Sequence, residues 1–309
     1  MSTNIRQNTS LFYGKKISDL LTNFPENAIL KTKKFRGDFM IRLYDQNIWG
    51  NFARTEKIGN RNQYILGLIK LYKPDFCTFQ ECNPSTSRSG KDPIQEIISD
   101  TFAEASPESA TKNFTPVFYN KHKYNCIEAE FIPYRGFNDW DSKSLTYAVL
   151  EEKETGKKIC IVSTHFWWEW EKPEDNLQRL ENVDQLKENC DKVFEKYGCP
   201  IIISGDFNNG YQDNPQIAEP YEKMRKLDFV DVRYTADITT DTHTCRHGIG
   251  VDLFQVEDGI YEGSGKPHHT IDYVFTYGKH LKATRFAVDI SQEALNSSDH
   301  SPLIADFEF

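Results

Sequence analysis

Apolar and polar positions follow one another along this chain in two patterns, one typical of strands and the other of helices. Short apolar runs predict strands over residues 40–49, 75–80, 159–164, 201–204, 271–276 and 303–309, and a two-stranded hairpin over residues 124–132 and 145–151. Between these runs, apolar residues recur three and four positions apart, which predicts helices over residues 65–72, 94–98, 183–197 and 217–227. Interleaved strands and helices indicate an α/β protein.

The chain is long enough for one large domain, and no linker rich in Pro, Gly or Ser divides it. Its 309 residues are 38% hydrophobic and 13% aromatic, which is enough to fill a substantial core. Residues 1–38 are polar and mixed, and we expect them to form an N-terminal arm or helix packed on the main fold. We expect residues 39–309 to form a single domain.

Charge and cysteine content restrict the partners and the compartment that we expect. The net charge of −9 and the sequence pI near 5.5 argue against a protein that holds long nucleic acid by bulk electrostatics. No apolar run approaches the ~20 residues of a membrane span, and the first residues lack the pattern of a secretory signal. Seven cysteines without paired spacing do not suggest a disulfide framework. We therefore expect a cytoplasmic monomer without a membrane span.

Polar residues stand at the ends of several predicted strands. The isoleucines at 201–203, for example, lead directly into Gly205, Asp206, Asn208 and Asn209. A carboxylate so close to a core is costly unless it is paired, hydrogen-bonded or bound to metal. Strand ends that meet at one edge of a sheet are where α/β proteins build sites. The candidates of this kind are Asn47, Glu81, His165, Asp206, Asn208, Asp272, Asp299 and His300.

The candidate side chains suit one kind of chemistry. Carboxylates and an amide carbonyl, without thiolates, suit a hard cation such as Mg²⁺ or Mn²⁺. Two histidines beside such an ion can accept a proton and contact a developing oxyanion. Taken singly, each segment has an ordinary alternative, because GDFN is often a turn, QE a helix cap or solvated charge, and SDH an N-cap. Their occurrence together, in this order, favours a site.

The motifs YDQNIW, PDFCTFQE, STHF, SGDFN, IDYVF and SSDHSP together resemble those of the endonuclease/exonuclease/phosphatase superfamily, which comprises deoxyribonuclease-I-like metal-dependent phosphoesterases. The resemblance extends from Arg42 to the end of the chain. It implies a four-layer sandwich in which two mixed β-sheets pack face to face with helices on the outside. Superfamily members include nucleases, inositol polyphosphate phosphatases and neutral sphingomyelinases, so the resemblance specifies the reaction class more closely than the substrate.

The resemblance also implies roles for single residues. Glu81 and Asn47 match the residues that bind the metal, Mg²⁺ or Mn²⁺, and Asp299 matches an acidic residue that completes the metal shell. Asp206 matches the aspartate that aligns or deprotonates the attacking water. Asn208 matches a neighbour that contacts the phosphate.

The two histidines complete the implied machinery. His300 matches the catalytic histidine, Asp272 the carboxylate that orients its ring, and His165 a histidine that contacts the scissile phosphate. Independently of the resemblance, a carboxylate paired with a histidine favours the imidazolium form. Whether Asp206 or His300 accepts the proton of the water stays open at this point.

Substrate contacts are less clearly marked in the sequence. Trp167 and Trp168 follow His165 almost directly, and they either stack on a ring of the substrate or pack a loop against the core. Lys143 either contacts phosphate or belongs to a plain turn. Arg179 lies on the helix after the tryptophans, where superfamily members often carry an arginine, and it either contacts substrate or forms a surface salt bridge.

A second group of possible ligands, His243, Cys245 and His247, invites a zinc interpretation. The Thr, Arg and Gly residues around them do not predict a helix, so the two histidines are not expected to share one helical face. We prefer the interpretation of a loop that approaches the active site.

These observations predict a metal-dependent hydrolase of phosphate esters, in the first place a phosphodiesterase, that acts by in-line attack of an activated water. The main alternative is a nuclease of the same superfamily acting on DNA or RNA. A third is an inactive binding protein on this fold, which the presence of Glu81, Asp206 and His300 disfavours. Acidic charge and clustered tryptophans favour a small phosphate ester, or the end of a nucleic-acid strand, as substrate.

Overall fold

Two β-sheets form the centre of the unit that runs from Phe39 to Phe309. The computed structural model of the chain describes residues 40–49, 61–82, 100–105, 113–210, 218–240, 242–245, 255–257, 260–262 and 269–309. The expected N-terminal arm and the helix expected over residues 94–98 lie outside these residues, as does His247.

The first sheet has seven described strands in the order β10–β14–β15–β1–β2–β4–β3. They are β10 (Ile238–Thr239), β14 (Ala283–Val288), β15 (Leu303–Glu308), β1 (Met40–Asn47), β2 (Phe76–Gln80), β4 (Val117–Asn120) and β3 (Phe102–Glu104). The second sheet has six described strands in the order β5–β6–β7–β8–β13–β9. They are β5 (Tyr124–Pro133), β6 (Ser144–Glu152), β7 (Lys158–His165), β8 (Ile201–Asp206), β13 (Asp272–Tyr277) and β9 (Val230–Asp231). A separate antiparallel pair consists of β11 (Gln255–Glu257) and β12 (Ile260–Glu262).

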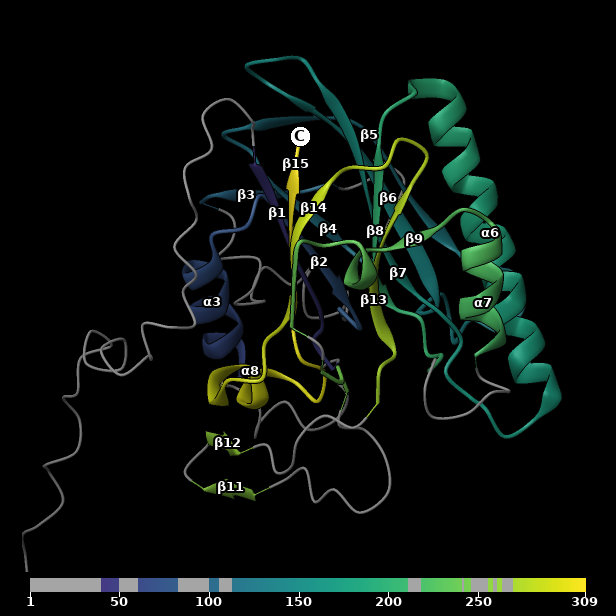
Figure 1. Cartoon of the computed structure of the whole chain (residues 1–309). Helices are drawn as coiled ribbons and strands as arrows, with labels where there is room; N and C mark the ends of the chain where they lie inside the picture. The colour runs from purple at the N-terminus through teal and green to yellow at the C-terminus, as the bar shows by residue number, and fades with distance from the viewer. Residues whose placement is uncertain are drawn as a thin grey trace, which may run out of the picture. The chain divides into compact units, whose positions relative to one another are not determined.

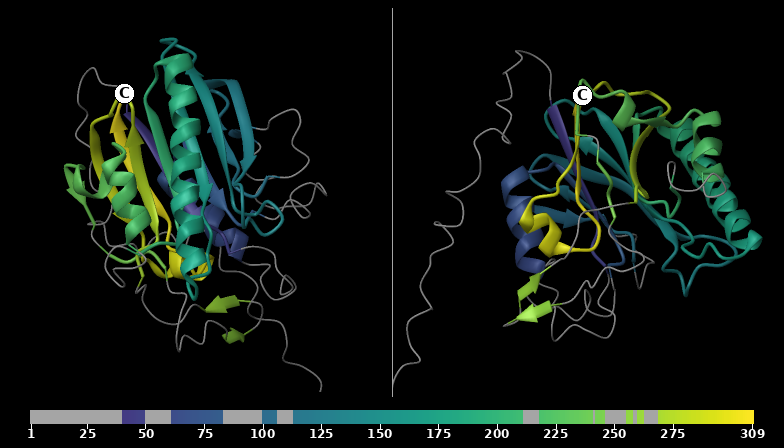
Figure 2. Two further views of the ribbon diagram at one scale, coloured as in Figure 1. Left: turned by 90° about the vertical axis from the view of Figure 1, so that its right-hand side faces the viewer. Right: turned by 60° about the horizontal axis from the view of Figure 1, so that its bottom comes forward.

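Helices cover the outer face of each sheet (Figures 1 and 2). Helices α3 (Arg61–Tyr72) and α8 (Gln292–Ser297) lie beside the first sheet, and α6 (Pro173–Tyr197) and α7 (Glu219–Lys226) beside the second. A short 3-10 helix, η2 (Val232–Tyr234), follows β9. One apolar cluster fills the space between the two sheets. A second cluster lies between the first sheet and its helices, and a third between the second sheet and its helices. The four-layer α/β sandwich implied by the resemblance is confirmed.

Strand β8 shows why its sequence reads as an uninterrupted apolar run. Ile202 points into the cluster between the two sheets, whereas Ile201 and Ile203 point into the cluster beneath α6 and α7. All three side chains are completely buried. A strand that is covered on both faces has no position for a solvated side chain, so its residues are apolar throughout.

The central strands of each sheet are parallel, and this places their carboxyl ends at one edge. β1 pairs in parallel with β2, and β7 pairs in parallel with β8. β13 runs antiparallel to β8, so its first residue, Asp272, lies opposite Asp206 at the end of β8. This arrangement brings the carboxyl ends of β1, β2, β7 and β8 and the first residue of β13 into one region.

Helix α6 is longer than its apolar pattern predicts. The pattern predicts a helix over residues 183–197, but α6 begins ten residues earlier at Pro173 and ends before Gly198, whose φ of 57° is left-handed. The first turns escape prediction because their buried residues are polar and include Asp175, Gln178 and Arg179. No helix in the described part of the chain is both long and apolar enough to cross a membrane.

The other predicted elements are confirmed where the structure describes them. The predicted hairpin consists of β5 and β6, which pair antiparallel. The prediction missed β14, which carries polar residues among its apolar ones (ATRFAV) and shifts register against β15. It also missed β4, whose four residues are too few to show a period.

We predict that Gly205→Ala destabilises the fold severely, because β8 approaches β7 too closely there for a side chain. The φ of Gly205 is +150°, and a Cβ would lie 2.0 Å from the backbone oxygen of Thr164. The substitution is expected to cost about 3 kcal/mol or more, measured as the free energy of unfolding in urea. Gly67→Ala is the control. A Cβ added at Gly67, which lies within α3, would have no atom of another element within 4 Å, so this change should stabilise the folded protein by about 0.5–1 kcal/mol. Equal effects of the two changes would contradict the prediction.

Candidate active site

The strand ends bring the predicted polar residues to one edge of the two sheets. Asn47 ends β1, Glu81 directly follows β2, His165 ends β7 and Asp206 ends β8. Asp272 opens β13 opposite Asp206. Asn47 and Glu81 belong to the first sheet and the other three to the second, so the site lies where the two sheets meet.

The carboxylate of Asp206 is the centre of this arrangement. Its Oδ2 accepts a hydrogen bond of 3.0 Å from the side-chain amide of Asn47, and its Oδ1 accepts one of 2.9 Å from the backbone N–H of Asn208. The Nε2 atoms of His165 and His300 lie 3.4 Å and 3.9 Å from Oδ2. Four groups from different segments therefore converge on one carboxylate.

Burial changes the proton affinity of Asp206. The residue is 2% exposed. Loss of solvation, together with the neighbouring charge of Asp272, raises the pKa of Asp206 to about 7, although the positive charges of His300 and Lys143 oppose this shift. A carboxyl group of this kind can exchange a proton near neutral pH.

Asn208 has two roles in holding the turn after β8. Its φ of 47° is left-handed, a conformation that asparagine tolerates, and this orientation turns its N–H toward Asp206. Its side-chain amide donates to the backbone oxygen of Phe166 at 3.1 Å. These bonds fix the loops after β7 and β8 against each other.

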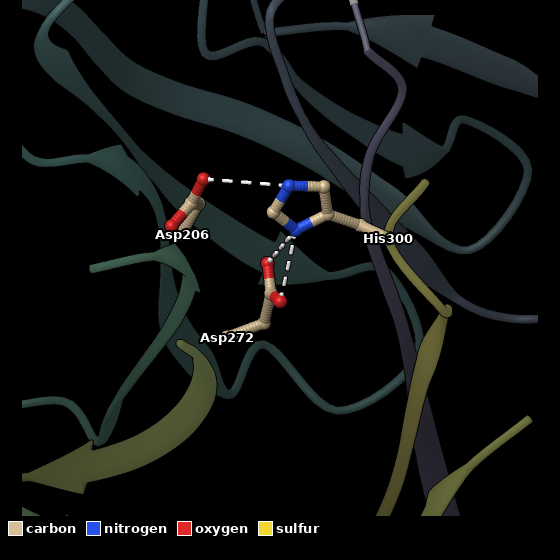
Figure 3. A group of neighbouring side chains, drawn as sticks. All are labelled: Asp206, Asp272 and His300. Atoms are coloured by element: carbon tan, nitrogen blue, oxygen red, sulfur yellow. Dashed lines mark hydrogen bonds and ion pairs between the residues drawn. The ribbon is translucent and has the colours of Figure 1, made fainter. Parts of the chain in front are cut away.

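His300 and Asp272 form an oriented pair (Figure 3). His300 Nδ1 lies 2.9 Å and 3.0 Å from the two carboxylate oxygens of Asp272, and Nε2 points toward Asp206. Burial alone would lower the pKa of His300, but the charges of Asp272, Cys245 and Asp299, together with the hydrogen bond to Asp272, outweigh burial and hold this pKa well above its usual value. His300 therefore carries a proton on Nε2 that it can donate.

The loop at residues 242–245 supports this pair. Thr244 Oγ1 donates to Asp272 Oδ2 at 2.6 Å, and Cys245 Sγ lies 3.5 Å from His300 Nε2. The interpretation of a loop that approaches the active site is thus supported for these residues. The sequence singled out Cys245 only as a possible zinc ligand, and it gave no signal for Thr244 beyond its place beside His243. His243 contacts the Thr270 hydroxyl at 3.1 Å.

Asn47 connects Asp206 to the residues implied as metal ligands. Its side-chain amide lies 3.2 Å from Glu81 Oε1, and its Oδ1 accepts from the N–H of Trp49 at 2.9 Å. The hydroxyl of Ser298 lies 2.7 Å from the Asn47 backbone oxygen and 3.2 Å from Asp299 Oδ1. Glu81 has a left-handed φ of 56°, a strained conformation that is typical of functional positions.

These oxygen atoms fit a hard divalent cation. The carboxylates of Glu81 and Asp206 approach the same amide group of Asn47, which places two acidic groups side by side. Such groups repel one another unless a cation lies near them. Asp206, Asp272 and His300 form an alternative group, with potential ligand atoms within 4.8 Å of one another. We favour the region around Glu81, because His300 Nδ1 and Asp272 already satisfy each other.

Polar side chains connect the two sheets beneath the site. The hydroxyls of Thr78 in β2 and Ser204 in β8 lie 2.7 Å apart, and Gln80 donates to the hydroxyl of Ser163 at 3.1 Å. Thr78 and Gln80 also donate to Asp45, whose burial raises its pKa to about 7. These polar contacts between the sheets take the place of apolar packing at the end of the sandwich that carries the site.

His165 contacts a lysine as well as Asp206. Lys143 directly precedes β6, and its Nζ lies 2.8 Å from His165 Nε2. Burial and the charge of Lys143 lower the pKa of His165 well below its usual value, so this ring is neutral. Burial also lowers the pKa of Lys143, whereas the charges of Glu81 and Asp206 oppose that shift.

Trp167 packs the loop after β7 rather than facing solvent. It is 7% exposed, and its indole N–H donates to Asp175 Oδ1 at 3.0 Å. Its backbone N–H donates to Asn182 Oδ1 at 3.0 Å. Of the two interpretations offered by the sequence, packing describes Trp167.

The neighbouring tryptophans are exposed near the site. Trp168, Trp170 and Trp140 are 50%, 61% and 90% exposed. The indole N–H of Trp168 donates to Asp139 Oδ2 at 2.7 Å, which ties the loop after β7 to the loop between β5 and β6. Residues 139, 140 and 141 all have left-handed φ angles, so the second loop turns sharply where it meets the first. We call Trp140, Trp168 and Trp170, with Asp139, the aromatic rim.

Arg179 holds the loop that follows β7. It is 1% exposed, and its guanidinium donates to the backbone oxygens of Trp167 and Glu169. The expectation of a surface salt bridge is therefore wrong, and the alternative of a direct substrate contact gains no support from this placement. A buried arginine fits here because two loop carbonyls accept from its guanidinium, whereas its Nε has no hydrogen-bond partner among the described residues.

Comparison with known proteins gives a partial sequence match. No protein-family model matches the chain. The chain is 27% identical over 176 residues to human Nocturnin (Homo sapiens), a stretch that covers 52% of this chain and 36% of Nocturnin. The match thus spans little more than a third of the length of that relative.

Solved structures match over most of the chain. An endonuclease/exonuclease/phosphatase from Bacteroides vulgatus has a TM-score of 0.65 at 18% identity, covering 88% of this chain and 99% of that one. A mannosyl-6-phosphatase from Bacteroides thetaiotaomicron has a TM-score of 0.62 at 16% identity, covering 87% and 100%. The human Nocturnin catalytic domain, solved with a bound sulfate anion, has a TM-score of 0.59 at 22% identity, covering 88% and 96%. The likeness read from the motifs extends to the architecture, and the chain has the endonuclease/exonuclease/phosphatase fold.

Proposed function

We propose that this protein is a metal-dependent hydrolase of phosphate esters, in the first place a phosphodiesterase. The observation that carries the proposal is the group formed by Asp206, His300 and Asp272 beside Asn47 and Glu81. It combines a proton acceptor, an oriented proton donor and carboxylates that suit a cation. The sulfate bound by the human Nocturnin catalytic domain is a tetrahedral anion like phosphate, which agrees with the proposal.

In the proposed reaction, Asp206 accepts the proton of the attacking water. The bonds from Asn47 and Asn208 hold its carboxylate in one orientation, so that the water is aimed in line with the leaving oxygen. His300 is ion-paired with Asp272 and therefore has a proton to give at Nε2. This proton stabilises the phosphoryl oxygen or the leaving group as negative charge develops.

Glu81, Asn47 and Asp299 would hold Mg²⁺ or Mn²⁺ in this proposal. When bound, the ion neutralises charge on the phosphoryl group and orients it. Asn47 would present its side-chain carbonyl oxygen to the ion through the lone pair that the N–H of Trp49 leaves open. The neutral imidazole of His165 lies beside Asp206 and contacts a phosphate oxygen.

The substrate proposed is a compact phosphate ester or the end of a nucleic-acid strand. The aromatic rim offers ring faces, and its carboxylate Asp139 disfavours additional phosphates. The mannosyl-6-phosphatase among the similar structures acts, by its name, on a compact sugar phosphate. The second candidate, a nuclease that follows long DNA or RNA, is disfavoured by the net charge of −9.

We predict that removal of metal abolishes hydrolysis and that Mg²⁺ or Mn²⁺ restores it. Because a cation that binds only the folded state stabilises it, either ion should also raise the Tm of the demetallated protein. Glu81→Gln should increase the metal concentration needed for this rise in Tm by about 10-fold or more. Glu154→Gln, in the exposed β6–β7 turn, should leave that concentration unchanged. Full activity in thoroughly demetallated protein would rule out the metal-dependent reaction.

We predict that His300→Ala and Asp206→Asn each lower kcat by about 10²- to 10⁴-fold, the scale of a positioned proton-transfer group. Because both groups serve one step, the double variant should lose less than the product of the two losses. His280→Ala, an exposed histidine after β13, is the control and should keep wild-type kcat. Near-normal turnover of either single variant would show that its role is misassigned.

We predict different effects for the two adjacent tryptophans. Trp168→Ala should raise KM for a ring-bearing phosphate ester by roughly 5- to 150-fold, the equivalent of about 1–3 kcal/mol of stacking, with a smaller change in kcat. Trp167→Ala should lower Tm, because it removes a buried indole and leaves Asp175 Oδ1 without the indole N–H that it accepts from. Steady-state kinetics and thermal unfolding of both variants make the comparison. Efficient nicking of plasmid DNA that falls steeply with salt would overturn the preference for a compact ester.

A further inference from the structure

We propose that Lys143 is a catalytic residue whose ammonium group contacts a non-bridging oxygen of the substrate's phosphoryl group. The proposal deepens the phosphoesterase function proposed above and rests on it for the reaction. It goes beyond that function by naming the side chain that supplies fixed positive charge to the phosphate. The binding of phosphate to Lys143 can be tested without any hydrolysis.

The backbone places Lys143 beside the site with little freedom. Its N–H donates to the backbone oxygen of Asn138 at 3.0 Å, and its own backbone oxygen accepts from the N–H of Tyr134 at 3.0 Å. The next residue, Ser144, pairs with His165 in the β6–β7 ladder. Since the backbone of Lys143 and the residue after it are fixed in this way, its side chain is held at the site, where it is only 5% exposed.

The ammonium group of Lys143 is poorly compensated where it lies. Its Nζ is 2.8 Å from His165 Nε2 and 3.5 Å from Nδ1 of the same ring. Among the described residues, no carboxylate oxygen comes within the 4 Å of an ion pair with Nζ, although Glu81, Asp206 and Asp139 are near enough to act on its charge. An ammonium has three donors, and a neutral imidazole offers one acceptor. A buried charge in this state is expected to have an anionic partner at some stage.

The strand register of the second sheet places the ammonium N–H donors of Lys143 in a row with His165 and Asp206. Ser144 pairs with His165, and His165 pairs with Asp206. Lys143, His165 and Asp206 therefore form a row across three strand ends, with His165 Nε2 in contact with both neighbours at 2.8 Å and 3.4 Å. A phosphoryl group placed in line with a water at Asp206 lies within reach of the lysine. Charge fixed there is worth most when negative charge develops, because Lys143, His165 and Asp206 are buried.

A purely structural role for Lys143 makes the opposite prediction about stability. A lysine that holds the loop together contributes to folding, so its removal lowers Tm. An uncompensated buried ammonium costs stability, so replacement by an apolar side chain of similar length leaves Tm unchanged or raises it. The two roles are therefore distinguishable in the absence of any ligand.

The test compares Lys143→Met with Lys226→Met, an exposed lysine at the end of α7, as a matched loss of one positive charge. Thermal unfolding is measured without ligand, and again with inorganic phosphate in the presence of Mg²⁺. We expect Lys143→Met to keep or exceed the wild-type Tm without phosphate and to lose the phosphate-induced rise that the wild type and Lys226→Met show. We also expect its kcat to fall by about 10²- to 10³-fold, the loss typical of one donor to a developing oxyanion.

Lys143→Arg keeps the charge and serves as the second variant if Lys143→Met does not fold. We expect it to retain part of the phosphate-induced rise in Tm. A rise in Lys143→Met equal to that of the wild type overturns the proposal, as does the absence of any rise in the wild type. If phosphate binding depends on Lys143 but no phosphate ester is hydrolysed, the anion contact stands and the proposed reaction fails, so the two proposals can fail separately.

Discussion

The carboxylate of Asp206, 2% exposed at the end of β8, is the constraint on which the rest of the site depends. A charge removed from water in this way destabilises the fold unless the surrounding groups compensate for it. Compensation comes from the amide of Asn47, the N–H of Asn208 and the positive charges of His300 and Lys143. Because Asn47 belongs to the other sheet, the same bond that stabilises the carboxylate also holds the two sheets in register at this edge. The interaction that positions the site therefore also contributes to the packing of the sandwich.

The sequence predicted most of this framework, because its signals are local. The buried strands β7 and β8 are apolar runs that end on His165 and Asp206, and parallel pairing brings such ends together. The first turns of α6 were missed because Gln178 and Arg179 are buried and polar, which contradicts the usual relation between burial and hydrophobicity. Their partners are loop carbonyls, and no sequence period records a contact between a helix and a loop.

Contacts from outside the strands could not be predicted for a related reason. Thr244 and Cys245 approach Asp272 and His300 only because their loop lies beside β13 in space. Lys143 had an ordinary interpretation as part of a turn, and its backbone does bond to that turn at Asn138. What the sequence could not show is that the side chain extends inward to His165. Direction of a side chain at the start of a strand depends on register, which is a property of the paired sheet.

The distribution of one residue type has an optical consequence. All five tryptophans of the chain lie at the edge that carries the site, and the three apolar clusters contain none of them. They are Trp49, Trp140, Trp167, Trp168 and Trp170. Trp49 bonds to Asn47, and the others belong to the loops around β5, β6 and β7. Intrinsic tryptophan fluorescence therefore reports on the environment of this edge. It reports little on the interior of the sandwich, where the aromatic residues are tyrosine and phenylalanine. Emission spectra act as a built-in probe of the site, and secondary-structure signals are needed to follow the core.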